Sequence, residues 1–214
     1  MKVIQNSKYL EKRVHRNNLA IIISSPSGAG KTTIARKLLS KVKNSYLSIS
    51  CTTREPRKGE KHGVDYFFLS KSKFRILNKK KKFLESAKVY DNYYGTLWSE
   101  IKKSKKKIIL LDVDWQGARS IRKVLKENCY SFFLLPPSLK ILKKRLIQRH
   151  NDNKKIAYKR FSSAKKDIKH WPEYNFVYVN KNLNKCVNEI YKQIFNLIKV
   201  TEDRSIIKNL VKKF

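Results

Sequence analysis

The sequence predicts an α/β protein whose parallel sheet is flanked by helices. Three observations predict this fold class: strands alternate with helices along the chain, two strands are apolar and buried, and a glycine-containing turn joins the first of them to a helix. The segments 19–23 and 108–113 are the two buried strands, and runs of this kind are typical of parallel sheets covered on both faces. Ligands of such sheets bind at the carboxyl ends of the strands, so we expect the functional site there.

The segment 19–42, LAIIISSPSGAGKTTIARKLLSKV, contains strand, turn and helix in succession. Gly28 and Gly30 allow backbone conformations that a side chain would penalise. Lys31 and Thr32 open a helix whose apolar residues recur at helical spacing. The N–H groups of such a turn and the positive end of the helix dipole favour an anion. Since the lysine can reach nucleotide phosphates and the threonine can ligate Mg²⁺, we interpret the segment as a phosphate-binding P-loop.

Ser25 replaces the first glycine of the general pattern G-x-x-x-x-G-K-[ST]. A glycine-containing turn between a strand and a helix is also common where no phosphate binds. We favour the phosphate site, because SGAGKTT directly follows a buried strand.

Further strands and helices alternate after this unit. We predict strands at 46–49, 66–68, 83–92, 108–113, 130–135 and 176–179. We predict helices at 73–78, 98–102, 117–127, 139–148, 156–168 and 187–198. The tripeptide YYG at 93–95 is predicted to be a turn, and HNDN at 150–153 to interrupt two basic helices.

The chain is strongly basic, with 51 Lys and Arg against 16 Asp and Glu among 214 residues, a formal net charge of +35. Such a charge suits nucleotides, nucleic acids or an acidic membrane surface. The lysines are dispersed in short runs, and the joint abundance of Lys, Asn and Ile indicates drift in an AT-rich genome. We therefore favour solvated surface charge and expect no specific nucleic-acid partner.

The cysteines and the chain ends indicate a cytoplasmic protein. Cys51, Cys129 and Cys186 lack metal-ligand spacing and suit a reducing compartment. No apolar run approaches the roughly 20 residues that span a bilayer, and 1–18 lacks the apolar core of a secretory signal, so we expect an N-terminal extension and no membrane partner. The basic tail 200–214 has apolar residues on one helical face. We favour its packing on its own domain or on a neighbouring subunit over binding to an anionic membrane.

Two further features concern charged residues. Asp112 ends the second buried strand and Asp114 follows it; beside a P-loop we interpret such an aspartate as an acidic group near Mg²⁺, although alone it is often a turn residue or a cap. Arg145, Arg149 and Arg160 flank the predicted helix break, where a lid could hinge. Phosphate clamping and simple surface exposure stay equally open for them.

The chain resembles the guanylate kinases, nucleoside monophosphate kinases that transfer a phosphoryl group from ATP to GMP. The matching segments are SSPSGAGKTT (24–33), SISCTTREPRKGEKHGVDYFF (48–68), FLESAKVYDNYYGT (83–96), ILLDVDWQGA (109–118) and FLLPPS (133–138), followed by RLIQRH…YKRF and EYNFVYVN. The resemblance covers residues from about 19 to 199 in family order. Its elements TTR-x-PR-x-GE-x-x-G-x-x-Y and NYYG are specific to this family.

The resemblance implies a P-loop NTPase-type parallel sheet flanked by helices, with an inserted nucleoside-monophosphate-binding subdomain of mixed strands and a helical lid. Within the domain 19–199, the core would comprise 19–49, 104–144 and 161–199, the GMP-binding region 50–103 and the lid about 145–160. It implies ATP:GMP phosphotransferase activity with Mg²⁺ in purine nucleotide metabolism and GMP recycling, with dGMP as a second acceptor. The oligomeric state stays open, a homo-oligomer included.

The resemblance also implies roles for individual residues. ATP would be bound by Ser25, Pro26, Ser27, Gly28, Ala29, Gly30, Lys31, Thr32, Thr33 and Asn180. The GMP site would be formed by Ser50, Arg54, Arg57, Tyr66, Glu85, Tyr94, Thr96 and Asp112. Mg²⁺ would be held by Thr32, with Asp112 or Asp114 directly or through water. The catalytic residues would be Lys31, Arg145, Arg149 and Arg160.

Glu85 would read the base, because a carboxylate accepts from guanine N1–H and from its exocyclic amine. Without the flanking motifs it would be interpreted as a surface carboxylate. His150, Lys154 and Lys155 depart from the family's lid, where glycine and acidic residues are usual, and this affects lid flexibility and closing electrostatics.

Two other classes of function stay in view. A non-catalytic module of the same fold would be expected to lose P-loop or lid residues, which are intact here. A protein whose partner is RNA or DNA finds no support in any recognisable nucleic-acid motif.

Overall fold

The central sheet consists of five parallel strands in the order β2–β7–β1–β8–β9. We describe it from a computed structural model that covers residues 19–103, 108–149 and 153–211. The strands are β1 Leu19–Ser24, β2 Ser45–Leu47, β7 Ile108–Asp112, β8 Cys129–Leu135 and β9 Phe176–Val179. In the register of β1, Ile23 lies opposite Asp112 on one side and Phe132 on the other. The predicted parallel sheet is confirmed.

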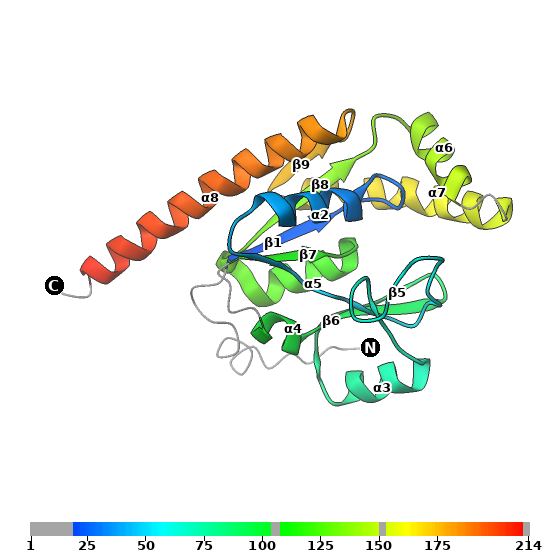
Figure 1. Ribbon diagram of the computed structural model, residues 1–214, viewed down its shortest axis with the longest axis horizontal. Helices are drawn as coiled ribbons and strands as arrows, with labels where there is room; N and C mark the ends of the chain where they lie inside the picture. The colour runs from blue at the N-terminus through cyan, green and yellow to red at the C-terminus, as the bar shows by residue number, and fades with distance from the viewer. Residues whose placement is uncertain (1–18, 104–107, 150–152, 212–214) are drawn as a thin grey trace.

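Helices cover both faces of this sheet (Figure 1). The covering helices are α2 Lys31–Lys41 and α8 Leu183–Val211 on one face, and α4 Trp98–Lys103 and α5 Trp115–Leu125 on the other. Because side chains alternate along a strand, Ile21 and Ile23 of β1 pack toward α2 and α8, while Ala20 and Ile22 pack toward α5. Burial on both faces accounts for the unbroken apolar sequence of β1.

A second, mixed sheet is formed by the chain between β2 and β7, in the order β4–β3–β6–β5. Its elements are β3 Cys51–Thr52, β4 Phe67–Phe68, α3 Lys71–Lys79, β5 Phe83–Val89 and β6 Asn92–Leu97. A small separate core holds it together, in which the rings of Phe74 and Phe83 stack at 4.4 Å. Arg36 of α2 forms an ion pair with Asp65, which links this part of the chain to the central sheet. The predicted subdomain of mixed strands is confirmed, and the domain boundaries stay predictions.

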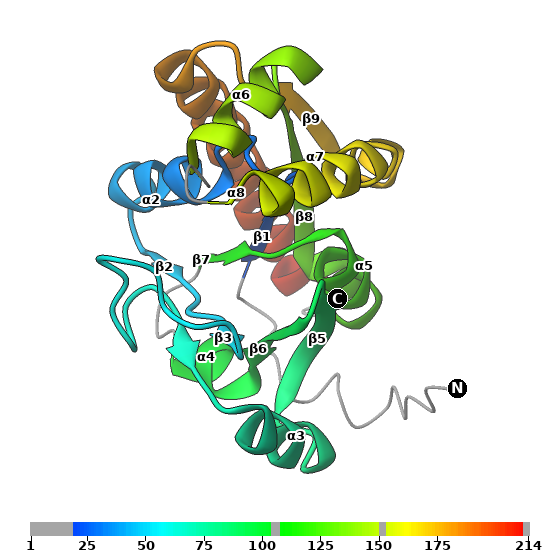
Figure 2. The same ribbon diagram turned by 90° about the vertical axis from the view of Figure 1, so that its right-hand side faces the viewer.

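Two basic helices, α6 Leu139–Arg149 and α7 Lys154–Ile168, pack against one another through Leu142, Leu146 and Ala164. In Figure 2 this pair lies in the upper part of the view, and α3 and the mixed sheet lie in the lower part. Of the predicted break HNDN, residues 150–152 lie outside the described part. Asn153 caps α7 by accepting a hydrogen bond from the Ile156 N–H at 3.0 Å.

The predicted turn at YYG is wrong. Tyr93, Tyr94 and Gly95 lie within strand β6. The chain instead reverses just before this strand, between Val89 and Asn92, which pair across the hairpin. Gly95 is needed for close packing and not for a turn, because a Cβ there would lie 2.9 Å from the Glu85 carbonyl oxygen and from the Phe83 ring.

The remaining helical segments are two short 3₁₀ helices and the long helix α8. Two short 3₁₀ helices occur at Lys126–Asn128 and Trp171–Glu173. Helix α8 is longer than the predicted 187–198 and projects away from the central sheet (Figure 1). The amphipathic face predicted for 200–214 and the extension 1–18 lie outside the described side chains. Within the described residues, no helix is both long and apolar enough to cross a membrane.

Replacing Gly95 by alanine should lower the free energy of unfolding by about 1–3 kcal/mol, because the new methyl group overlaps backbone as well as a ring. Urea unfolding monitored by circular dichroism measures the change. Ser86→Ala, on the exposed residue that pairs with Gly95, is the matched control and should stay within about 0.5 kcal/mol of the wild type. Equal stability of Gly95→Ala and wild type would contradict the tight packing.

Candidate active site

The loop between β1 and α2 has the geometry of an anion-binding turn. Gly28 and Gly30 adopt φ values of +88° and +100°, in the left-handed region that glycine favours. Leu142 and Leu146 of α6 approach so closely that a Cβ on Gly28 would lie 3.0–3.1 Å from their side chains. The loop is therefore held between the central sheet and α6, with the N-terminus of α2 pointing into the site.

Asn180 follows β9 and is buried against this loop. Its Nδ2 donates to the Ala29 carbonyl oxygen at 2.9 Å, and a Cβ on Gly30 would lie 2.7 Å from the same nitrogen. Asn180 thus fixes the shape of the loop from behind.

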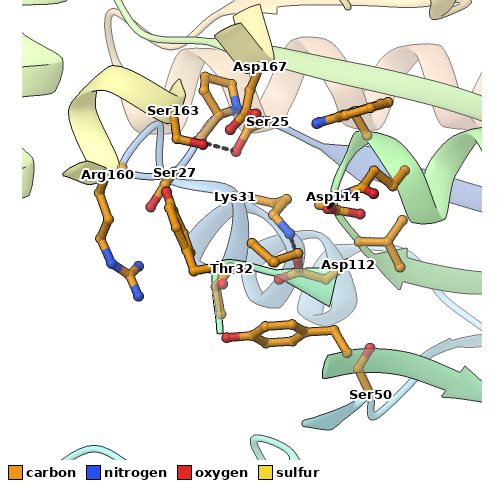
Figure 3. A pocket seen from close by; sticks show the side chains of 18 of the residues that line it. Ser25, Ser27, Lys31, Thr32, Ser50, Asp112, Asp114, Arg160, Ser163 and Asp167 are labelled. Atoms are coloured by element: carbon orange, nitrogen blue, oxygen red, sulfur yellow. Dashed lines mark hydrogen bonds and ion pairs between the residues drawn. The ribbon is translucent and has the colours of Figure 1, made fainter. Parts of the chain in front are cut away.

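Lys31, the first residue of α2, forms an ion pair with Asp112 at the carboxyl end of β7. Burial alone would lower the pKa of Lys31, but attraction to Asp112, Tyr66 and Asp114 raises it above its ordinary value. The ammonium group stays charged at neutral pH and lies beside the P-loop (Figure 3).

Five arginines line the same cavity and come from three parts of the chain: Arg54, Arg57, Arg145, Arg149 and Arg160. Burial, together with repulsion from Arg149, Arg54 and Arg160, lowers the pKa of Arg57 to about 10. Arg57 remains protonated at neutral pH, yet the lowered value shows that its charge is poorly balanced. An anion among these guanidinium groups would be strongly stabilised.

Glu60 forms ion pairs with two of these arginines, Arg54 and Arg57. Its carboxylate accepts from Arg54 Nη2 at 2.9 and 3.0 Å and from the Arg57 N–H at 2.8 Å. Because these bonds hold Arg54 in place, Glu60 shapes the arginine cluster. We gave it no role from the sequence, although it lies within the family motif that contains both arginines.

Glu85 occupies a different part of the cavity wall and is only 6% exposed. Thr96 Oγ1 donates to its Oε1 at 2.8 Å, and Gly117 leaves room for Oε2, since a Cβ there would lie at 2.9 Å. Burial raises the pKa of Glu85 to about 7, with a contribution from the nearby Asp114 carboxylate. A buried carboxylate with one oxygen already bonded can bind a ligand that presents N–H donors.

Most predicted site residues line one cavity of about 610 Å³, part of which Figure 3 shows. They are Ser25, Pro26, Ser27, Gly28, Gly30, Lys31, Thr32, Thr33, Ser50, Arg54, Arg57, Tyr66, Glu85, Tyr94, Asp112, Asp114, Arg145, Arg149 and Arg160. Three predicted residues do not line it: Ala29, Thr96 and Asn180, all buried behind the wall. Thr96 is connected to the cavity by the hydrogen bond that it donates to Glu85, which lines the wall.

Further wall residues were not predicted. Ser163 and Asp167 lie on α7 three and seven residues beyond Arg160, and Tyr90 and Trp115 come from the β5–β6 hairpin and the start of α5. The α7 residues could have been found from their helical spacing to Arg160. Tyr90 and Trp115 lie within the family segments 83–96 and 109–118, but we gave them no role from the sequence.

The residues at the end of β7 fit a hard divalent cation. Thr32 at the start of α2 and the carboxylates of Asp112 and Asp114 are oxygen donors, as Mg²⁺ prefers. Asp112 Oδ1 is buried and forms an ion pair with the Lys31 ammonium beside the P-loop. Asp114 also caps α5, accepting from the Gly117 N–H at 2.8 Å. Among the described residues no three His, Cys, Asp or Glu side chains form a metal cluster.

Comparison with known proteins gives a consistent result. The family model described as guanylate kinase matches residues 17–197. A guanylate kinase of Rickettsia felis is 43% identical over 85% of this chain and 95% of its own length, and one of Paramagnetospirillum magneticum is 42% identical over 81% and 82%. The crystal structure of a guanylate kinase from Anaplasma phagocytophilum superposes with a TM-score of 0.66 at 32% identity, covering 86% of this chain and 85% of that one. The chain belongs to the guanylate kinase family.

Proposed function

We propose that this protein transfers the terminal phosphoryl group of ATP to GMP, giving ADP and GDP. The observation that carries the proposal is one cavity lined by both a P-loop and a buried carboxylate, Glu85. The loop suits the triphosphate of the donor, and the carboxylate suits the guanine of the acceptor. The arginines between them suit the phosphates of both nucleotides.

GMP would bind against the mixed sheet. Arg54 and Arg57 would form charge-assisted hydrogen bonds with its phosphate, and Tyr66 and Tyr94 would add hydroxyl donors. The Arg54 guanidinium lies 5.5 Å from the centre of the Tyr66 ring, so the two groups already share one side of the cavity. dGMP would bind in the same way as far as base and phosphate are concerned.

Glu85 would select guanine. Its carboxylate can accept from guanine N1–H and from the exocyclic amine, with Ser50 nearby on the wall. Adenine presents an acceptor at N1, so AMP would leave Oε2 of this buried carboxylate without a donor, while Thr96 still donates to Oε1. The missing hydrogen bond would make AMP bind much more weakly than GMP, so discrimination between the two would be strong.

ATP would place its phosphates in the P-loop. Lys31 would donate to them, while Asn180 maintains the loop from behind. Mg²⁺ supplies charge neutralisation when bound with ATP, and Thr32, Asp112 and Asp114 are the residues that would hold it. Arg145, Arg149 and Arg160 would approach the transferring group from the α6–α7 pair.

No general base is required for the transfer. A phosphate monoester has a second pKa of about 6, so the attacking oxygen of GMP is largely ionised at neutral pH. The chain's own residues would act by aligning the two phosphates and by balancing their charge. The expected cytoplasmic location agrees with a nucleotide substrate pool and stays a prediction.

A coupled ADP-release assay with ATP and Mg²⁺ tests the proposed reaction against GMP, dGMP, AMP, CMP and UMP. We expect turnover with GMP and dGMP alone. Lys31→Ala should lower kcat by roughly 10²–10³-fold, because a preorganised donor to the phosphates is lost. Lys37→Ala, exposed on the same helix, is the matched control and should keep wild-type activity. Folded wild-type protein that binds GMP yet turns over none of the five would sink the kinase proposal.

The pH dependence of GMP use tests the role of Glu85. Since the pKa of Glu85 is raised to about 7 and only the ionised carboxylate accepts two donors, kcat/KM for GMP should fall as the pH drops below about 7. Glu85→Gln should lower kcat/KM roughly 10–100-fold at pH 8 and shift the midpoint toward about 6, where GMP itself titrates. Glu55→Gln, an exposed acid, should change neither quantity. An unshifted midpoint in Glu85→Gln would refute the assignment.

A further inference from the structure

The tip of the β5–β6 hairpin carries an aromatic residue in an unfavourable backbone conformation. Val89 and Asn92 pair across the hairpin, so Tyr90 and Asp91 form the tip. Tyr90 has a φ of +56°, in the left-handed region that is rare for a bulky side chain and favours glycine. Such an outlier persists where surrounding contacts hold it, and these positions cluster at functional sites.

The contacts that hold Tyr90 come from α7. Its ring centre lies 5.2 Å from the Arg160 guanidinium carbon, and Ser163, one turn further along α7, lines the same cavity. Beside them, Asp91 and Lys159 approach to 3.7 Å, a weak pair because both are exposed. Figure 3 shows Arg160 and Ser163 on α7 at the edge of the pocket.

Arg160 and Arg54 are in contact with different kinds of partner. Arg54 is paired with Glu60, whereas among the described residues no carboxylate forms an ion pair with Arg160. An aromatic ring attracts a guanidinium without neutralising it and leaves its N–H donors available. Tyr90 therefore fixes the direction of Arg160 while keeping its full charge for a phosphate.

We propose that Tyr90 is a positioning residue: it orients Arg160 toward the transferring phosphoryl group through the contact between its ring and the guanidinium. This rests on the proposed function, in which Arg160 acts on that group. The same hairpin carries Glu85 and Tyr94, so the strand pair that would bind GMP also orients an arginine of the α6–α7 pair.

Substituting Tyr90 by glycine removes the ring and suits the backbone, so folding should be preserved with an unchanged or higher melting temperature. We expect kcat to fall 10- to 100-fold, because Arg160 loses its orientation, while KM for GMP changes less than threefold. Tyr90→Phe keeps the ring and should lose less than fivefold. Lys81→Gly, at another non-glycine residue with positive φ (+51°) between α3 and β5, is the matched control and should keep wild-type kcat.

A double-mutant cycle separates positioning from a general structural effect. In an Arg160→Ala background, Tyr90→Gly should cause no further loss of kcat, since its effect passes through Arg160. An equal loss in both backgrounds, or no loss in the wild-type background, would overturn the proposal.

Hydrogen exchange gives a readout that does not depend on turnover. In Tyr90→Gly the amides of residues 154–163 should exchange faster than in wild type, and in Lys81→Gly they should not. Unchanged exchange in Tyr90→Gly would overturn the contact itself. Absence of GMP turnover in the wild type would instead count against the proposed reaction, and the exchange comparison would still decide whether Tyr90 holds α7.

Discussion

The concentration of positive charge at one edge of the parallel sheet constrains the rest of the structure. Five arginines and Lys31 reach a single cavity, where burial and mutual repulsion lower the pKa of Arg57 and burial is the main cause of the lowered pKa of Arg160. Glu60 and Asp112 balance only part of this charge. The P-loop, the mixed sheet and the α6–α7 pair all contribute cations to the same cavity. This arrangement is suited to binding phosphate groups.

Both sheets contribute residues to the site. The central sheet supplies Lys31 and Asp112, while the mixed sheet supplies Glu85 on β5, whose neighbouring Leu84 packs into the core between the central sheet and α5. The Arg36–Asp65 ion pair also connects the two parts of the chain. Donor and acceptor would thus be aligned by residues from both sheets, and phosphoryl transfer depends mainly on that alignment.

The sequence predicted those features that are encoded locally. The buried strand, the glycines of the P-loop and α2 follow from periodicity and backbone preference, and the family motifs located the arginines and Glu85. The YYG prediction was wrong because Gly95 serves close packing against Glu85 and Phe83, which only the paired strand reveals. Tyr90 was missed for a related reason: its conformation depends on α7, about 70 residues away in the chain, and no turn pattern precedes it.

The surplus of buried cations has a consequence for the lifetime of the protein. A nucleotide that binds only the folded state stabilises it by mass action, by about 2.7 kcal/mol when its concentration is 100 times its dissociation constant. Because the arginine cluster lacks enough carboxylates of its own, phosphate binding relieves a repulsion that the empty protein retains. Depletion of nucleotides would therefore both slow the reaction and expose more of the protein to proteolysis, linking its abundance to the pool on which it acts.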